Sequence, residues 1–169
     1  MTELIVNGDA EQGLTGWLTV AGTPAAIRYD RGDGYPGAGD PGPANRGTQF
    51  FGGGTSPRST LRQSVTMPRR AASFTVSAWL GGYAGQQDGA QLTVEFLDCD
   101  GIPRGAVVLG PLTASERGSA TGLFERTARG TVPPGSRRAV VTLLMTRAGS
   151  GTSNDGYADN ISLTVTGGR

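Results

Sequence analysis

The sequence lacks histidine and has a single cysteine, Cys99, and both shortages exclude chemistry. Without histidine, the chain has no Ser-His-Asp or Cys-His catalytic arrangement, no imidazole general base and no zinc site built on histidine. Cys99 cannot form an internal disulfide, and its place at an expected strand end in FLDCDG predicts a space-filling residue rather than a reactive thiol. Walker and Cys-x-x-Cys patterns are also absent.

The chain also lacks long apolar runs and a marked net charge. No run approaches the roughly 20 residues that a membrane helix needs, and the N-terminus has neither the basic nor the apolar region of a signal peptide. The formal net charge of +1 gives no electrostatic reason to expect a nucleic-acid or membrane-surface partner. We therefore expect a soluble chain, cytoplasmic as written, or extracellular if it is a domain excised from a secreted protein.

Apolar residues are spread evenly along the 169 residues and are separated by 29 glycines and 10 prolines, which suits one turn-rich domain over 1–169. Six segments are rich in apolar and strand-forming residues: 48–53, 61–67, 72–82, 90–98, 123–132 and 138–147. In several of them apolar and polar residues alternate strictly, which is typical of a β-strand with one buried face. About eight to ten strands of this kind, each with one buried face, predict an all-β fold, an antiparallel β-sandwich. The Gly- and Pro-rich segment 31–47 predicts a long exposed loop within the domain.

Two segments at opposite ends of the chain, 4–17 and 155–165, each join an expected strand to a turn rich in oxygen donors. These donors are Asn7, Asp9 and Glu11 in the first segment and Asp155, Asp159 and Asn160 in the second. If the two ends of the chain lie side by side, they could share a calcium ion, which takes about six to eight oxygens at roughly 2.3–2.6 Å, backbone carbonyls included. The alternative is that these side chains cap turns through hydrogen bonds to the backbone.

The pattern N-G-x-x-E-x-G-x-x-x-W over 7–17, the aromatic strand GTQFF over 47–51 and the closing YADNISL over 157–163 resemble the carbohydrate-binding modules of families 4, 9 and 22. This resemblance covers almost the whole chain and implies a jelly roll of the galactose-binding-like type. It further implies a bacterial protein that binds carbohydrate in a lectin-like way and does not catalyse a reaction. It also implies a structural calcium ion held by the backbone carbonyls of Asp9 and Gly47 and by the carboxylates of Glu11 and Asp159. Asn160 stands where the family often has a second acid, which removes one charge.

A sugar site needs an aromatic platform edged by planar polar side chains, because sugar rings present apolar faces rimmed by hydroxyls. Alternation places Trp79 on the polar face of its strand, and in-register pairing of the next strand would add Gln91 and Glu95 to that face. The alternative is that Trp79 lies under a loop as part of a second, minor core. Trp17, in the opening motif, is expected to pack in the main core.

Loop residues are further candidates for contacts with a saccharide. Tyr83 follows the strand of Trp79, while Arg147 precedes a glycine-rich loop that contains Asn154. Each could donate or accept hydrogen bonds with sugar hydroxyls, or could be an ordinary solvated turn residue.

The leading functional hypothesis is a monomeric or weakly dimeric module that binds a saccharide or another hydroxylated small ligand. A second hypothesis is a small-molecule enzyme, of the cyclase or isomerase type, in which Glu95 or Asp98 has a pKa raised by burial. A glycosidase that uses Glu95 and Glu125 as its two carboxylates is a further form of that hypothesis. The third hypothesis is a calcium-stabilised structural or adhesive domain.

Overall fold

The structure, a computed structural model, describes residues 1–168, which form eleven β-strands and no helix. The strands are β1 (Thr2–Glu3), β2 (Leu18–Ala21), β3 (Ala25–Arg28), β4 (Gln49–Gly52), β5 (Arg58–Thr66), β6 (Ala71–Gly82), β7 (Gly89–Leu97), β8 (Pro103–Leu109), β9 (Gly122–Thr131), β10 (Arg138–Thr146) and β11 (Tyr157–Gly167). Within 1–168 there is no helix long and apolar enough to cross a membrane.

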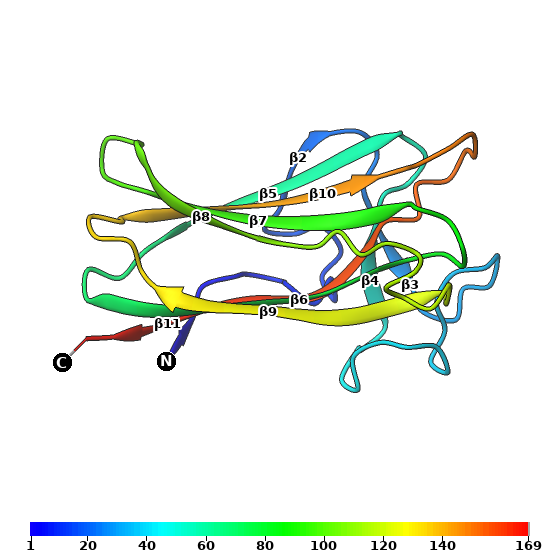
Figure 1. Cartoon of the computed structure of the whole chain (residues 1–169), viewed down its shortest axis with the longest axis horizontal. Helices are drawn as coiled ribbons and strands as arrows, with labels where there is room; N and C mark the ends of the chain where they lie inside the picture. The colour runs from blue at the N-terminus through cyan, green and yellow to red at the C-terminus, as the bar shows by residue number, and fades with distance from the viewer. Residues whose placement is uncertain (169) are drawn as a thin grey trace.

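The strands form two antiparallel sheets that lie one above the other, with both chain termini at the same end (Figure 1). The first sheet has the order β3-β4-β11-β6-β9, and β1 pairs with β11 beside this path. The second sheet has the order β2-β5-β10-β7-β8. The prediction of an all-β antiparallel sandwich is therefore confirmed.

The main core fills the space between the two sheets, and period-two alternation decides which residues enter it. Along β10, Ala139, Val141, Leu143 and Met145 are all fully buried, whereas the residues between them are partly exposed. Each large apolar side chain buried in this way contributes about 1.5–3 kcal/mol relative to an exposed one. Trp17 packs in this core as predicted, edge-on to Phe51 with ring centroids 5.5 Å apart.

A second, smaller core lies on the outer face of the first sheet. Phe50 and Phe51 are adjacent in β4 and both are fully buried, although alternation points them to opposite faces. Phe51 enters the main core, and Phe50 enters a set that we call the outer cluster: Ile27, Tyr29, Phe50, Leu123 and Tyr157.

The loop 31–47 connects β3 to β4 and covers part of the outer cluster. Tyr35 packs from this loop against Phe50 and Tyr157, with ring centroids 6.4 and 6.1 Å apart. The tip of the loop is exposed as predicted, but Pro36 and Pro43 within it are buried.

The two ends of the chain lie side by side, as the oxygen-rich motifs suggested. Thr2 pairs with Val165, and the backbone N–H of Leu4 donates to the carbonyl of Leu163 at 2.9 Å. Further along, the backbone N–H of Ile161 donates to the carbonyl of Gly8 at 2.9 Å. The N-terminal turn is thus fixed against β11.

Candidate functional site

The structure does not bring the six predicted ligand-binding residues together. Strand β6, which carries Trp79, pairs with β9 and β11 in the first sheet, whereas β7, which carries Gln91 and Glu95, pairs with β8 and β10 in the second. The prediction of one shared face is therefore wrong, because the chain crosses from one sheet to the other between β6 and β7. For the same reason Glu95 and Glu125, which lies in β9, cannot act as a carboxylate pair.

Neither outer sheet face offers an open aromatic platform in the described strands. Trp79 is half-buried and packs against the outer cluster, which is the minor-core alternative. The outer face of the second sheet carries Gln91 and Glu95 but no aromatic side chain, because Phe96, the one aromatic residue in its strands, points into the main core.

Asn154 serves the fold rather than an open site. Its side chain is 2 % exposed, and its Nδ2 donates to the carbonyls of Ser56 and Met145, both at 2.9 Å. Its Oδ1 accepts the backbone N–H of Gly156 at 3.2 Å. Both amide donors and one acceptor position of Asn154 are thus engaged in holding the β10–β11 loop against the β4–β5 loop and β10, so Asn154 has a structural role, and its contact with a ligand stays a prediction.

Three loops meet at the end of the sandwich opposite the termini: β3–β4, β6–β7 and β10–β11 (Figure 1). They enclose two adjoining hollows of about 390 and 360 Å³ that share Ser153 and Asp155. We call the two together the loop-end cleft. Its hydroxyl lobe is lined by Gln86, Asp88, Arg147, Ser150 and Thr152, and its tyrosine lobe by Arg31, Asp33, Tyr35, Tyr83 and Tyr157.

Asp155 stands at the junction of the two lobes, and its side chain is 9 % exposed. Oδ1 accepts a hydrogen bond of 2.9 Å from the hydroxyl of Tyr157, whereas Oδ2 accepts none from the residues that the structure describes. Burial raises the pKa of Asp155; the hydrogen bond from Tyr157 opposes this rise, and the nearby charge of Asp88 adds to it. The free oxygen is a hydrogen-bond acceptor open to a ligand.

Two buried charged residues hold the loops around this junction. Asp88 is 1 % exposed, and its two oxygens accept the backbone N–H groups of Ala148 at 2.8 Å and of Asp155 at 2.9 Å. Arg117 is 2 % exposed and donates to the carbonyls of Ala84, Ala120 and Gln86. Its Nε has no partner among residues 1–168. Sequence reasoning missed both residues, since neither lies in a recognisable motif.

The aromatic side of the cleft depends on contact between two loops. The ring of Tyr83 lies against Gly34, where an added Cβ would come within 2.8 Å of Cε2, and the φ of +86° at Gly34 also favours glycine. Arg31 stacks over Tyr35 at 5.3 Å from its ring centroid. Of the six predicted ligand-binding residues, Tyr83 and Arg147 line the cleft.

The predicted calcium ligands lie around the N-terminal turn, away from the cleft. Glu11 accepts three hydrogen bonds, from the backbone N–H groups of Thr48 and Gln49 and from the hydroxyl of Thr48, at 2.8–2.9 Å. Burial raises the pKa of Glu11, but these bonds outweigh it and lower the pKa overall. Gly47, with φ +62°, leaves room for this carboxylate, because a Cβ there would stand 2.6 Å from its Cδ.

Asp159 is the most enclosed of the four predicted ligands, with a side chain that is fully buried. Burial raises its pKa to about 7, and the charges of Glu11 and Asp9 add to the rise, although hydrogen bonds from Tyr29 and the Asn160 backbone oppose it. Within 1–168 no three His, Cys, Asp or Glu side chains gather closely enough to hold a metal by themselves. The donor set fits a hard cation only if backbone carbonyls complete it.

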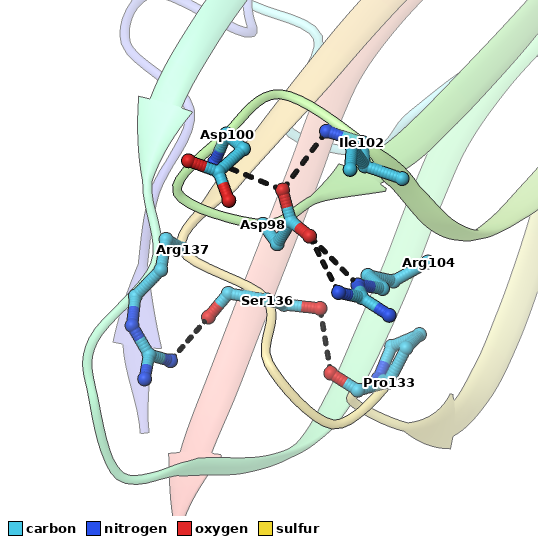
Figure 2. Close-up of polar contacts among 7 residues, drawn as sticks. All are labelled: Asp98, Asp100, Ile102, Arg104, Pro133, Ser136 and Arg137. Carbon is cyan, nitrogen blue, oxygen red and sulfur yellow. Dashed lines mark hydrogen bonds and ion pairs between the residues drawn. The ribbon is translucent and has the colours of Figure 1, made fainter.

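Asp98 was a candidate acid or base, and the structure contradicts the raised pKa on which that role depended (Figure 2). Its Oδ1 accepts the backbone N–H groups of Ile102 and Asp100, both at 2.9 Å, and its Oδ2 forms an ion pair with Arg104 at 2.6 Å. The bond from Ile102 and the guanidinium of Arg104 hold the pKa of Asp98 below its ordinary value. Asp98 stabilises the β7–β8 turn, at the end of the sandwich opposite the cleft.

No family model and no curated protein matches the chain. Among solved structures it is similar to a family 16 carbohydrate-binding module, with a TM-score of 0.62 and 22 % identity over 95 % of this chain and 99 % of that one. It is also similar to a family 61 module solved with β-1,4-galactotriose, with a TM-score of 0.59 and 15 % identity over 98 % and 100 %. The chain has the jelly-roll fold of carbohydrate-binding modules.

The same fold occurs within a larger protein, tailspike protein 4 of bacteriophage CBA120. The TM-score is 0.68 at 13 % identity, and the match covers 97 % of this chain but 21 % of the tailspike chain. The chain therefore spans about a fifth of that solved tailspike chain, which is the enzymatically active domain. These likenesses show the fold, and the predicted jelly roll is confirmed.

Proposed function

We propose that the chain is a non-catalytic carbohydrate-binding module whose saccharide lies in the loop-end cleft. The observation that carries this proposal is Asp155, a nearly buried carboxylate that leaves one oxygen free at the junction of a lobe lined by tyrosines and a lobe lined by hydroxyls. Such a site on the fold of carbohydrate-binding modules has the two features that a sugar needs, apolar ring surface and fixed polar groups.

Each lobe has a distinct part in binding. Tyr35 and Tyr83 are half-buried, so their rings supply apolar surface to a sugar ring at little entropic cost. Gln86 and the serine and threonine residues of the other lobe offer both donors and acceptors, which suits hydroxyls that act as both. The combined hollows fall in the usual size range of small-ligand sites, about 300–1,000 Å³.

The experiment is a binding measurement on a glycan array and by calorimetry with wild type, Tyr83→Ala and Gln91→Ala. We expect Tyr83→Ala to weaken saccharide binding about tenfold or more, since a buried aromatic contact typically provides more than 1 kcal/mol. Gln91→Ala is the matched control, because Gln91 lies on the outer face of the second sheet. Absence of binding to any glycan, or an equal loss in Gln91→Ala, would overturn the proposal.

We also propose a structural calcium ion at the N-terminal turn, held by the carboxylates of Glu11 and Asp159 and the backbone carbonyls of Asp9 and Gly47. The proposal is supported by the burial of Asp159 near two further acids, Glu11 and Asp9, because a charged carboxylate costs free energy in such a place. A divalent cation would remove this cost. Calcium would supply positive charge between the N-terminal turn and β11. Because the cleft lies elsewhere, this role is one of stability rather than ligand recognition.

A further inference from the structure

The junction of the loop-end cleft holds two carboxylates that form no ion pair among residues 1–168, although the buried guanidinium of Arg117 interacts electrostatically with one of them, Asp88. Asp88 and Asp155 are 1 % and 9 % exposed, and the backbone N–H of Asp155 donates to Asp88 at 2.9 Å. The one ion pair among residues 1–168 joins Asp98 to Arg104, at the opposite end of the sandwich. A ligand at the junction therefore meets the carboxylate of Asp155, which has no ion-pair partner among the described residues and is nearly buried, where charges interact more strongly than in bulk water.

The two arginines that line the cleft, Arg31 and Arg147, contact other groups than the two carboxylates. Arg147 directs its Nη1 toward the carbonyls of Thr55 and Thr152, at 3.4 and 3.3 Å, which are contacts within the protein. Arg31 is exposed and stacks over Tyr35 in the tyrosine lobe. Neither guanidinium forms an ion pair with Asp155 or Asp88 in the described chain.

The two residues shared by both hollows differ in their hydrogen-bonding groups, because the hydroxyl of Ser153 can donate and accept whereas the carboxylate of Asp155 can only accept. Both oxygens of Asp88 and Oδ1 of Asp155 already accept hydrogen bonds. Oδ2 of Asp155 remains, and as a carboxylate oxygen it accepts and does not donate. A sugar hydroxyl can donate to it, whereas a sugar carboxylate can neither donate nor approach without repulsion.

We propose, on the basis of the carbohydrate-binding function above, that Asp155 determines specificity by selecting neutral saccharides with a free hydroxyl at the junction and rejecting uronate-containing ones. The selection has an attractive part, a charge-assisted hydrogen bond, and a repulsive part, a like charge in a nearly buried site. Losing the hydrogen bond alone corresponds to about a tenfold to hundredfold loss of affinity.

The substitution Asp155→Asn isolates this role because it preserves the size of the side chain. The amide oxygen can still accept from Tyr157, while the amide nitrogen replaces the free acceptor with a donor and removes the charge. Asp100→Asn is the matched control, since Asp100 is an exposed carboxylate in the β7–β8 turn, at the end of the sandwich opposite the cleft.

The test measures affinity by calorimetry for two sets of probes: neutral β-1,4-galactotriose, xylohexaose and cellohexaose, and acidic oligogalacturonate and oligoalginate. We expect wild type to bind at least one neutral probe and to bind the acidic ones tenfold or more weakly. Asp155→Asn should weaken binding of the neutral probes about tenfold or more and reduce the difference in affinity between the two classes. Asp100→Asn should change neither affinity.

The outcomes distinguish the specificity role of Asp155 from the carbohydrate-binding function on which it rests. Acidic probes that bind wild type as tightly as neutral ones, or an unchanged Asp155→Asn, would overturn the specificity role and leave the carbohydrate-binding function standing. Failure of every probe of both classes would overturn both. The comparison of probes on wild type needs no variant, so equal affinity for the two classes would overturn the specificity role even if Asp155→Asn unfolds.

Discussion

Asp88 accepts the backbone N–H of Asp155 at 2.9 Å, and this bond joins the β6–β7 loop to the β10–β11 loop. The other oxygen of Asp88 accepts the N–H of Ala148 at 2.8 Å, so one side chain fixes both ends of the glycine-rich segment between them. Loops built from Gly and Ser have much conformational freedom to lose on folding. The cleft is therefore held in shape by a buried carboxylate beneath it before any ligand arrives.

Replacing Asp88 with alanine should loosen this segment without affecting the main core. Two backbone donors lose their acceptor, and each buried donor left unsatisfied costs about 1–3 kcal/mol. We expect a lower free energy of unfolding in denaturant titration and faster amide exchange at Ala148 and Asp155. Glu95→Ala is the control, because Glu95 lies on the outer face of the second sheet. Unchanged exchange at the two amides would contradict the structural role of Asp88.

Arg117 should stabilise the β6–β7 loop, which carries Tyr83 and Gln86, just as Asp88 stabilises the β10–β11 loop. Its guanidinium supplies donors to three main-chain carbonyls, and Arg117→Met removes all of them while keeping much of the apolar stem. We expect a loss of about 2–4 kcal/mol in unfolding free energy and weaker saccharide binding. Arg117→Lys should recover part of both, since an ammonium group reaches fewer of the three carbonyls than the planar fork does. Equal stability of the methionine variant and wild type would show that the bonds contribute nothing.

The sequence was sufficient for strands β4 to β7 and β9 to β11, for the core position of Trp17 and for the pairing of the two chain ends, but it did not predict β2, β3 and β8. It was insufficient for the site, because alternation shows which residues share one face of a strand but not which sheet the strand joins. Strands β6 and β7 follow each other in the chain yet belong to different sheets, which separates Trp79 from Gln91. Asp88 and Arg117 act through long-range contacts to backbone groups, and such contacts leave no local pattern.

Calcium should raise the melting temperature if the ion binds at the N-terminal turn. A ligand that binds only the folded state stabilises it by about 2.7 kcal/mol at one hundred times its dissociation constant. We expect a higher melting temperature in calcium than in chelator, and no such difference in Asp159→Asn or Glu11→Gln. Glu125→Gln, an exposed carboxylate of β9, should keep the full response. A wild-type melting temperature that is the same in calcium and in chelator would rule out the site.

Acidification should weaken saccharide binding. The loss should begin at a higher pH than it would if the aspartate in the site had an ordinary pKa. Burial and the charge of Asp88 raise the pKa of Asp155, and protonation converts its free acceptor oxygen into a hydroxyl that no longer carries charge. The other ionisable groups lining the cleft are Tyr157, Tyr83, Tyr35, Arg31, Asp33 and Arg147. Of the groups at this end, Asp155 is the carboxyl whose titration reaches the bound hydroxyl directly.

The contribution of Asp155 to the stability of the unliganded protein should respond to pH in the opposite direction. A carboxyl whose pKa is higher in the folded than in the unfolded state contributes stability at low pH, and that contribution is lost as the pH rises through the folded value. Acid should therefore strengthen the Asp155 contribution to folding while it weakens binding. Calorimetric affinity and unfolding free energy, measured over the same pH series in wild type and Asp155→Asn, would separate the two effects. If the affinity of Asp155→Asn falls with acid as steeply as that of wild type, another group controls the pH dependence.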